Sequence, residues 1–228
     1  MMNLKEMAAI QALTYLQDGM ILGLGTGSTV KYFIDLLGER CRSQQLKQIR
    51  IVPTSQSTAA LAQQQGLPLV SLKDFPVLDL AVDGADEVDP QLNLIKGLGR
   101  ALLREKIVEI HASRFIVIVD ESKLVDRLGR GPLPVEILPF EFLAHLRWLN
   151  SLGCRAELWL EEDGQPILTD NGNFLARCWF PNGIENAFEL ARRLNDRPGV
   201  IEHGLFLNMA SDVIIAGMDG IKYLKKEL

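Results

Sequence analysis

The sequence predicts an α/β protein with a mainly parallel sheet, followed by a second, smaller α+β domain. From residue 4 to residue 119, short apolar runs alternate with segments whose apolar residues recur at helical spacing, which is the order of βαβ units. The run at residues 115–119 is apolar throughout, as expected of a strand covered on both faces. After residue 129 the expected strands are separated by turns and single helices, which is typical of an α+β unit.

The first domain opens with an expected amphipathic helix over residues 4–16. A short apolar run at residues 20–22 predicts a strand that ends in glycines, and helical spacing returns at residues 30–37. The same alternation predicts strands at residues 49–52, 78–82 and 115–119, and helices at residues 57–65 and 101–111.

A cluster of glycines and prolines predicts a stiff connection between the domains, namely Gly129, Gly131, Pro132, Pro134 and Pro139. The elements expected after it are helices at residues 141–152 and 184–194, strands at 156–160 and 174–179, and turns at 170–172 and 197–199. A strand at residues 212–216 is expected to return to the first sheet. The predicted domains are therefore residues 1–130 with 205–228, and residues 131–204.

The composition excludes several classes of protein. A formal net charge of -5 argues against nucleic acid as the main partner, and no apolar run is long enough to cross a bilayer. The three cysteines are widely spaced and odd in number, which predicts neither a metal-ligand pair nor a disulfide framework. A reducing compartment, the cytoplasm, is expected.

The segment GLGTGST at residues 23–29 lies between a predicted strand and a predicted helix. Glycines let the backbone approach a ligand closely, and the following helix N-terminus offers unpaired N–H groups to an anion. A phosphate site and a plain tight turn with Ser28 or Thr29 as helix N-cap fit these residues about equally. The glycine spacing is not that of dinucleotide-binding loops, whose third glycine comes one position later.

Asp83, Asp86 and Glu87 follow the strand predicted at residues 78–82. Ligands of open parallel sheets bind beyond the carboxyl ends of the strands, and three close carboxylates repel one another unless they are paired or used. A solvated acidic turn and a Mg²⁺ site remain open alternatives, because Mg²⁺ needs only carboxylate ligands.

A second glycine-rich turn, KGLG at residues 96–99, enters the helix predicted at residues 101–111, and Glu105 falls within its first turns. A carboxylate there faces either the ligand edge of the sheet or an exposed neighbour such as Lys106. Lys123 closes the segment DESK, which follows the strand predicted at residues 115–119. Four such segments at one edge of one sheet favour a binding site over unrelated surface turns.

Together these segments resemble type A ribose-5-phosphate isomerases. The matching motifs, in chain order, are GTGST at residues 25–29, DGADE at 83–87, KGxG at 96–99, REK at 104–106, DxSK at 120–123, PLPVE at 132–136, TDNGN at 169–173 and GLF at 204–206. They extend over most of the chain. One departure is Leu98, at a position where the family often has glycine.

The resemblance implies a Rossmann-like first domain, a small α+β domain and a homo-oligomer, most simply a dimer. It also implies the interconversion of ribose 5-phosphate and ribulose 5-phosphate, a step of the pentose phosphate pathway, through an enediolate. Glu105 matches the family's base, with Asp83 and Lys96 as further catalytic residues. The substrate-binding residues that it implies are Lys5, Thr26, Gly27, Ser28, Thr29, Asp83, Gly84, Ala85, Asp86, Lys96, Gly97, Leu98, Gly99 and Lys123.

Neither a metal nor a cofactor is expected, since one carboxylate that reaches both C1 and C2 can move the proton. The expected partners are a sugar phosphate and further copies of the chain, without nucleic acid or membrane. Two alternatives remain, a non-catalytic sugar-phosphate sensor and a coenzyme A transferase with a glutamate nucleophile, because related folds host different functions.

Overall fold

The computed structural model describes residues 3–226, which divide into two compact units. Within these residues, unit 1 comprises 3–85, 104–123 and 208–226, and unit 2 comprises Asp86–Leu103 and Leu124–Leu207. Each unit has its own sheets and its own hydrophobic cluster.

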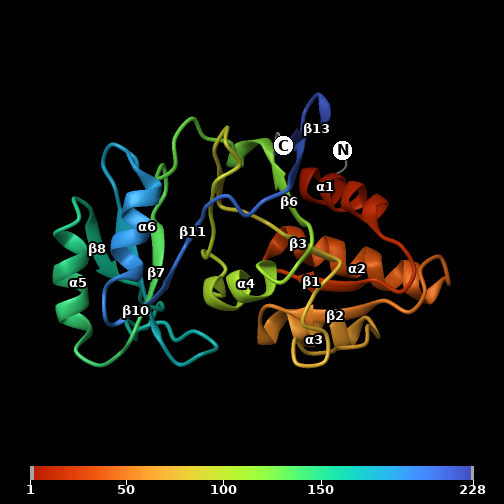
Figure 1. Ribbon diagram of the computed structural model, residues 1–228, viewed down its shortest axis with the longest axis horizontal. Coiled ribbons are helices and arrows are strands. Elements are labelled where there is room, and N and C mark those ends of the chain that lie inside the picture. The colour runs from red at the N-terminus through yellow and green to blue at the C-terminus, as the bar shows by residue number, and fades with distance from the viewer. Residues whose placement is uncertain (1–2, 227–228) are drawn as a thin grey trace. The chain divides into compact units, whose positions relative to one another are not determined.

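Unit 1 is built on a six-stranded sheet in the order β13-β12-β6-β3-β1-β2 (Figure 1). Its strands are β1 (Ile21–Leu24), β2 (Arg50–Pro53), β3 (Leu80–Asp83), β6 (Phe115–Asp120), β12 (Asp212–Gly217) and β13 (Gly220–Lys225). From β2 to β12 neighbouring strands are parallel, and only the pairing of β12 with β13 is antiparallel. The predicted mainly parallel sheet is confirmed, and so is the return of the late strand to it.

The helical elements of unit 1 connect these strands. They are α1 (Leu4–Ala12), η1 (Leu13–Tyr15), α2 (Ser28–Arg42), α3 (Gln56–Gln64), α4 (Leu102–Glu109) and η2 (Glu121–Lys123). The chain passes from unit 2 into unit 1 within α4, at Arg104. The predicted helices over residues 4–16, 57–65 and 101–111 correspond to α1 with η1, to α3 and to α4.

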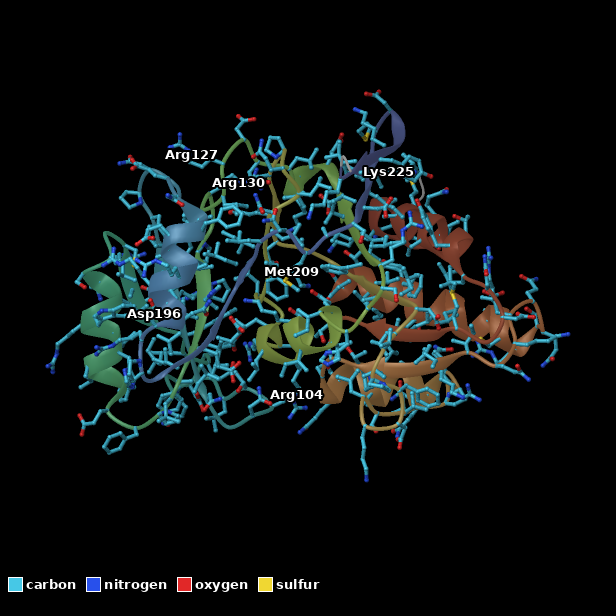
Figure 2. All side chains as sticks on the ribbon, in the orientation of Figure 1. Arg104, Arg127, Arg130, Asp196, Met209 and Lys225 are labelled. Atoms are coloured by element: carbon cyan, nitrogen blue, oxygen red, sulfur yellow. The ribbon has the colours of Figure 1, made fainter. Side chains whose placement is uncertain are left out.

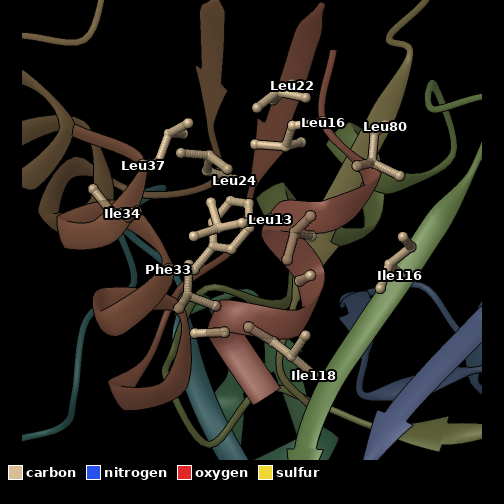
Figure 3. Close-up of a cluster of buried hydrophobic side chains, with 14 of the residues drawn as sticks. Leu13, Leu16, Leu22, Leu24, Phe33, Ile34, Leu37, Leu80, Ile116 and Ile118 are labelled. Atoms are coloured by element: carbon tan, nitrogen blue, oxygen red, sulfur yellow. The ribbon is translucent and has the colours of Figure 1, made fainter. Parts of the chain in front are cut away.

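One face of the sheet packs on α1 and α2, and Figure 3 shows the side chains that meet there. Alternate residues of a strand point to opposite faces, so Leu22 and Leu24 of β1 face this cluster together with Ile118 of β6. The helices contribute Phe33, Ile34 and Leu37 of α2, together with Leu13 and Leu16 after α1. Gly23, between the two strand leucines, faces the opposite side, which α4 covers.

Unit 2 contains two antiparallel sheets, in the orders β10-β7-β9-β8 and β11-β5-β4. Its strands are β4 (Glu87–Val88), β5 (Leu94–Ile95), β7 (Leu133–Ile137), β8 (Arg155–Leu158), β9 (Phe174–Trp179), β10 (Val200–His203) and β11 (Leu205–Phe206). The helices α5 (Phe142–Asn150) and α6 (Ala187–Asn195) pack on the larger sheet through Leu149, Leu190 and Leu194. Residues 86–103 belong to this unit because β5 pairs with β11 in the smaller sheet.

The structure corrects the interpretation of residues 129–139 as a stiff connection. Residues Leu133–Ile137 form β7, which pairs with β9 on one side and β10 on the other. Proline lacks an N–H for the ladder and is tolerated near the start of a strand. Pro134 is the second residue of β7 and precedes the register with β10, which begins at Val135. The proline pattern therefore hid a central strand.

Because the core of unit 1 is closely packed, truncating a buried side chain should be costly. We expect Ile118→Ala, at an isoleucine with 0% exposure, to lower the free energy of unfolding by about 2–5 kcal/mol. Ile110→Ala is the matched control, since Ile110 is 63% exposed just after α4. Urea unfolding measures both, and equal losses would contradict the packing described here.

Candidate active site

The sheet order brings four polar segments to one edge of unit 1. β2, β1, β3 and β6 are neighbours and run parallel, so their carboxyl ends lie side by side. Residues 25–29 follow β1, Asp83 ends β3 and is followed by residues 84–85, and residues 121–123 follow β6. These three segments were expected at this edge, and the structure brings them together there. KGLG at residues 96–99 was expected at the same edge as well, but it follows β5 of the three-stranded sheet in unit 2. The fourth, residues 54–58 after β2, was not expected.

Asp83 is the buried centre of this edge, with 0% exposure. Its Oδ1 accepts hydrogen bonds from the amides of Thr26 at 3.2 Å and Gly84 at 2.6 Å. A Cβ added at Gly25 would lie 1.8 Å from the Asp83 Cγ. Any residue other than glycine at position 25 would therefore occupy the space of the carboxylate.

Thr26 is held by a cluster of hydroxyl groups that sequence reasoning missed. Its Oγ1 lies 2.8 Å from the Thr54 Oγ1, 2.8 Å from the Ser55 Oγ and 3.1 Å from the Thr58 Oγ1. The Thr58 hydroxyl also donates to the carbonyl of Gly25 at 2.7 Å. The available signal was the polar run PTSQST at residues 53–58, directly after a predicted strand.

The N-terminus of α2 has the features of an anion site. Gly27 is its N-cap, at φ 129°, and no side chain caps the helix, so neither Ser28 nor Thr29 is the N-cap, as the plain-turn alternative had assumed. The Nζ of Lys5, on α1, donates to the Ser28 Oγ at 2.7 Å. A helix N-terminus with an ammonium group beside it attracts negative charge.

Contacts near its C-terminal end orient α4 against the sheet. The carbonyl of His111, just past the helix, accepts a hydrogen bond of 2.8 Å from the amide of Leu78, which precedes β3. Farther back along α4, Val108 lies against β1, since a Cβ added at Gly23 would be 2.7 Å from the Val108 Cγ1. The helix therefore runs antiparallel to β1 and β3, and its first turns lie toward their carboxyl ends.

Glu105 lies on the buried face of α4, one turn before Val108, and is 2% exposed. Three residues of helix correspond to about 4.5 Å, which is between one and two residues of strand at ~3.3 Å each. Val108 contacts Gly23, so Glu105 lies one to two residues farther toward the carboxyl end of β1. It is therefore level with Leu24 and Gly25, where Asp83 lies. The neighbouring Arg104 is half-buried and extends from α4 (Figure 2).

In unit 2, a second group of predicted residues is assembled around Lys96, which is 2% exposed. The Oδ2 of Asp86 accepts a hydrogen bond of 2.9 Å from the amide of Leu98. Gly97 has φ +108°, and a Cβ there would lie 2.8 Å from the Leu102 side chain. Leu98 does not have the positive φ that favours glycine, and its side chain is 38% exposed. Leucine is therefore accommodated at this position of the loop.

The three acidic residues of the DGADE segment accept hydrogen bonds from different backbone amides. Glu87 is buried, and its carboxylate accepts hydrogen bonds from the amides of Gly129 at 2.7 Å and Gly131 at 2.5 Å. Asp83 is held by amides of unit 1 and Asp86 by the amide of Leu98 in unit 2. Each of the three carboxylates thus has amide donors that compensate its negative charge.

The remaining predicted residue, Lys123, ends η2 and is half-buried. Asp120, at the end of β6, fixes this turn by accepting the amide of Ser122 at 3.0 Å. Among residues 3–226, no group of three or more His, Cys, Asp and Glu side chains is placed to hold a metal ion. Within the same range, no helix is both long enough and apolar enough to cross a membrane.

Comparisons with known proteins agree on one family. The chain matches the family model described as ribose 5-phosphate isomerase A (phosphoriboisomerase A) over residues 50–220. It is 48% identical over 222 residues to the ribose-5-phosphate isomerase A of Bacillus mycoides, with 97% of this chain and 99% of that protein covered. It is 46% identical over 227 residues to the ribose-5-phosphate isomerase A of Pyrococcus horikoshii, with 98% of each covered.

Solved structures agree with the sequence matches. A D-ribose-5-phosphate isomerase in complex with phospho-erythronic acid superposes with a TM-score of 0.95 at 45% identity, covering 98% of this chain and 100% of that chain. The ribose 5-phosphate isomerase of Plasmodium falciparum superposes with a TM-score of 0.95 at 37% identity, covering 99% of each chain. These matches confirm the α/β fold class.

The contact between position 25 and Asp83 can be tested by stability. We expect Gly25→Ala to lower the free energy of unfolding by about 1–3 kcal/mol, the usual range for overpacking a filled site. Gly84→Ala is the control, because the nearest atom to a Cβ there is the Ile118 carbonyl oxygen at 3.8 Å. Chemical unfolding of both variants gives the comparison. If Gly25→Ala were no less stable than Gly84→Ala, Asp83 would not occupy the space described.

Proposed function

Because the chain belongs to the ribose 5-phosphate isomerase A family, we propose that it moves a proton between C2 and C1 of its substrate with Glu105 as the base. The reaction is the interconversion of ribose 5-phosphate and ribulose 5-phosphate, an aldose–ketose isomerisation. One observation carries the assignment of the base: Glu105 is a carboxylate of 2% exposure at the height of the strand-end loops. The family favours this enzyme over a sugar-phosphate sensor or a coenzyme A transferase.

The proposed chemistry is a two-step proton transfer. In the open-chain aldose the carboxylate of Glu105 takes the C2 proton, and the electron pair left behind forms an enediolate with negative charge on the C1 oxygen. The proton of the C2 hydroxyl passes to the C1 oxygen, which moves the negative charge to the C2 oxygen. The same carboxyl group then returns a proton to C1, and the C2 oxygen becomes the ketone oxygen. Negative charge that develops on oxygen is best stabilised by donors held in place beforehand, and we assign this role to the Lys96 ammonium group and its loop.

Asp83 and Asp86 are proposed to hold the sugar hydroxyls and to help open the furanose ring. Both carboxylates are oriented by backbone amides, Asp83 by Thr26 and Gly84 and Asp86 by Leu98. A carboxylate fixed in this way presents its remaining acceptor positions in constant directions. The Leu98 amide thus orients Asp86, which leaves the stabilisation of the enediolate chiefly to Lys96.

The phosphate is proposed to bind at the edge of unit 1. The N-terminus of α2, with Ser28 and Thr29 in its first turn, supplies the amides, and Lys5 and Lys123 supply positive charge. Among similar proteins, the isomerase solved with phospho-erythronic acid shows that a phosphorylated sugar acid is a ligand of that enzyme. A ligand of the same kind is expected to bind here.

We also propose a homodimer and a cytoplasmic location. The dimer is proposed from the family, and an interface between two copies would cover exposed apolar side chains of unit 2 such as Phe140 at 75%, Leu143 at 53% and Phe188 at 51% exposure. All three cysteines are free thiols, as is usual in a reducing compartment. Burial raises the pKa of the Cys41 thiol and so favours its neutral form.

The proton transfer proposed here uses one carboxylate and one ammonium group and needs no metal. We therefore expect kcat to be unchanged after dialysis against a strong chelator, with removal verified by elemental analysis. A sample given Mg²⁺ or Zn²⁺ afterwards serves as the comparison. Activity that disappears with the chelator and returns with either ion would contradict the metal-free mechanism.

The role of Glu105 is tested by Glu105→Gln, which keeps the size of the side chain but removes the carboxylate that accepts the proton. Removing a general base typically lowers the rate on the order of 10²–10⁴-fold, so kcat should fall by that factor while KM changes little. Glu109→Gln is the matched control, because Glu109 is buried one turn later on the same helix, farther from the carboxyl ends of the strands. A Glu105→Gln enzyme with near-normal kcat would make Asp83 or Asp86 the leading candidate for the base.

A further inference from the structure

The segment GLF at residues 204–206 matches the family pattern but has no part in the function described so far. It consists of Gly204 and the two-residue strand β11, and it lies directly beside the Lys96 loop within unit 2. In β11, Leu205 pairs with Ile95 and Phe206 pairs with Leu94. The two residues before Lys96 are therefore the cross-strand partners of Leu205 and Phe206.

Gly204 fixes the main chain of Lys96. The amide of Lys96 donates to the carbonyl of Gly204 at 2.9 Å, and the amide of Gly204 donates to the carbonyl of Pro134 in β7 at 2.8 Å. A Cβ added at Gly204 would lie 2.2 Å from the Lys96 carbonyl oxygen. Since that atom belongs to the backbone, a larger residue would have to displace the Lys96 loop.

Phe206 contacts the side-chain end of Lys96. The Nζ of Lys96 lies 5.3 Å from the centroid of the Phe206 ring, within the range of a cation–π interaction. Lys96 is 2% exposed and Phe206 is 0% exposed. A cation–π interaction is stronger when both groups are removed from water, and both of these groups are buried.

A ring face suits an ammonium group that must stabilise negative charge on a substrate. The contact with the Phe206 ring adds no formal negative charge beside the substrate oxygen on which charge develops.

We propose that Gly204 and Phe206 are positioning residues for Lys96: Gly204 sets its backbone, and the Phe206 ring holds its ammonium group where the enediolate forms. This inference rests on the role proposed above for Lys96. Phe206 acts through Lys96 and need not touch the substrate. The alternative is that Phe206 only fills the core of unit 2, where its volume but not its electron density would matter.

The two possibilities separate when the ring is fluorinated, because fluorine withdraws electron density from the ring face and changes its size little. Phe206 is replaced by mono-, di- and trifluorophenylalanine, and kcat and KM are measured with ribose 5-phosphate. We expect log kcat to fall in steps with each fluorine, to a total loss of roughly three- to thirty-fold, with KM little changed. The same series at Phe33, equally buried in the unit 1 core, is the control and should leave kcat unchanged.

The same series in a Lys96→Met background shows whether Phe206 acts through Lys96. There fluorination should have no further effect on the residual kcat. A flat series in the wild-type background, or equal losses with and without Lys96, would overturn the inference. Lys96→Met by itself tests the function proposed above: near-normal kcat in that variant would remove the role of Lys96 and this inference with it. A large loss in Lys96→Met with a flat fluorine series would remove only the inference.

The backbone half of the inference is tested by Gly204→Ala, which should lower kcat because the added Cβ displaces the Lys96 carbonyl. Thermal unfolding of the variant is recorded alongside, so that kcat is compared on folded protein. An unchanged kcat would show that Gly204 does not position Lys96.

Discussion

The carboxylate of Asp83 fills the space where a side chain at position 25 would be, and the loop after β1 closes over it. Two parallel strands are tied together by this contact at the edge where ligands of such sheets bind. The amide of Thr26 is directed toward Asp83, and α2 begins two residues later. The direction of α2, and with it the proposed phosphate site, therefore depends on a buried carboxylate that needs a glycine opposite it.

Contacts of the same kind explain how each unit can bury charged side chains. Buried charges are tolerated when hydrogen bonds satisfy them. Asp83, Asp86 and Glu87 each accept hydrogen bonds from different backbone amides, and the Lys96 ammonium group lies against an aromatic ring. Glu87 is thereby a structural residue, which holds the chain at Gly129 and Gly131, although it belongs to the same motif as Asp83.

Much of this site could be predicted from the sequence because strand ends and glycine-rich turns are local signals. Short apolar runs followed by GTGST, DGADE and DESK placed three segments at one edge, and the strand order confirms that placement. The hydroxyl cluster of Thr54, Ser55 and Thr58 was missed because serine and threonine after a strand are ordinary turn residues. Their importance comes from the neighbouring strand, which the local sequence does not specify.

The errors have a physical origin as well. Prolines at residues 132 and 134 masked the strand β7, since a proline near a strand start is tolerated only in a context set by its partner strands. Strands of two residues, such as β5 and β11, carry no periodicity, and their pairing places residues 86–103 in unit 2.

Leu98 departs from the family pattern, yet its backbone amide makes the contact with Asp86. A leucine supplies this amide as well as a glycine does.

The central claim is that isomerisation proceeds by proton transfer through an enediolate. The most direct test is to convert ribose 5-phosphate in heavy water with the wild-type enzyme and to locate deuterium in the product by NMR. The account predicts deuterium at C1 of ribulose 5-phosphate, in one of its two stereochemical positions, because the carboxyl group that carries the proton exchanges with solvent. Transfer of the C2 hydrogen to C1 without any uptake of deuterium, which is the result expected of a hydride shift, would contradict the account.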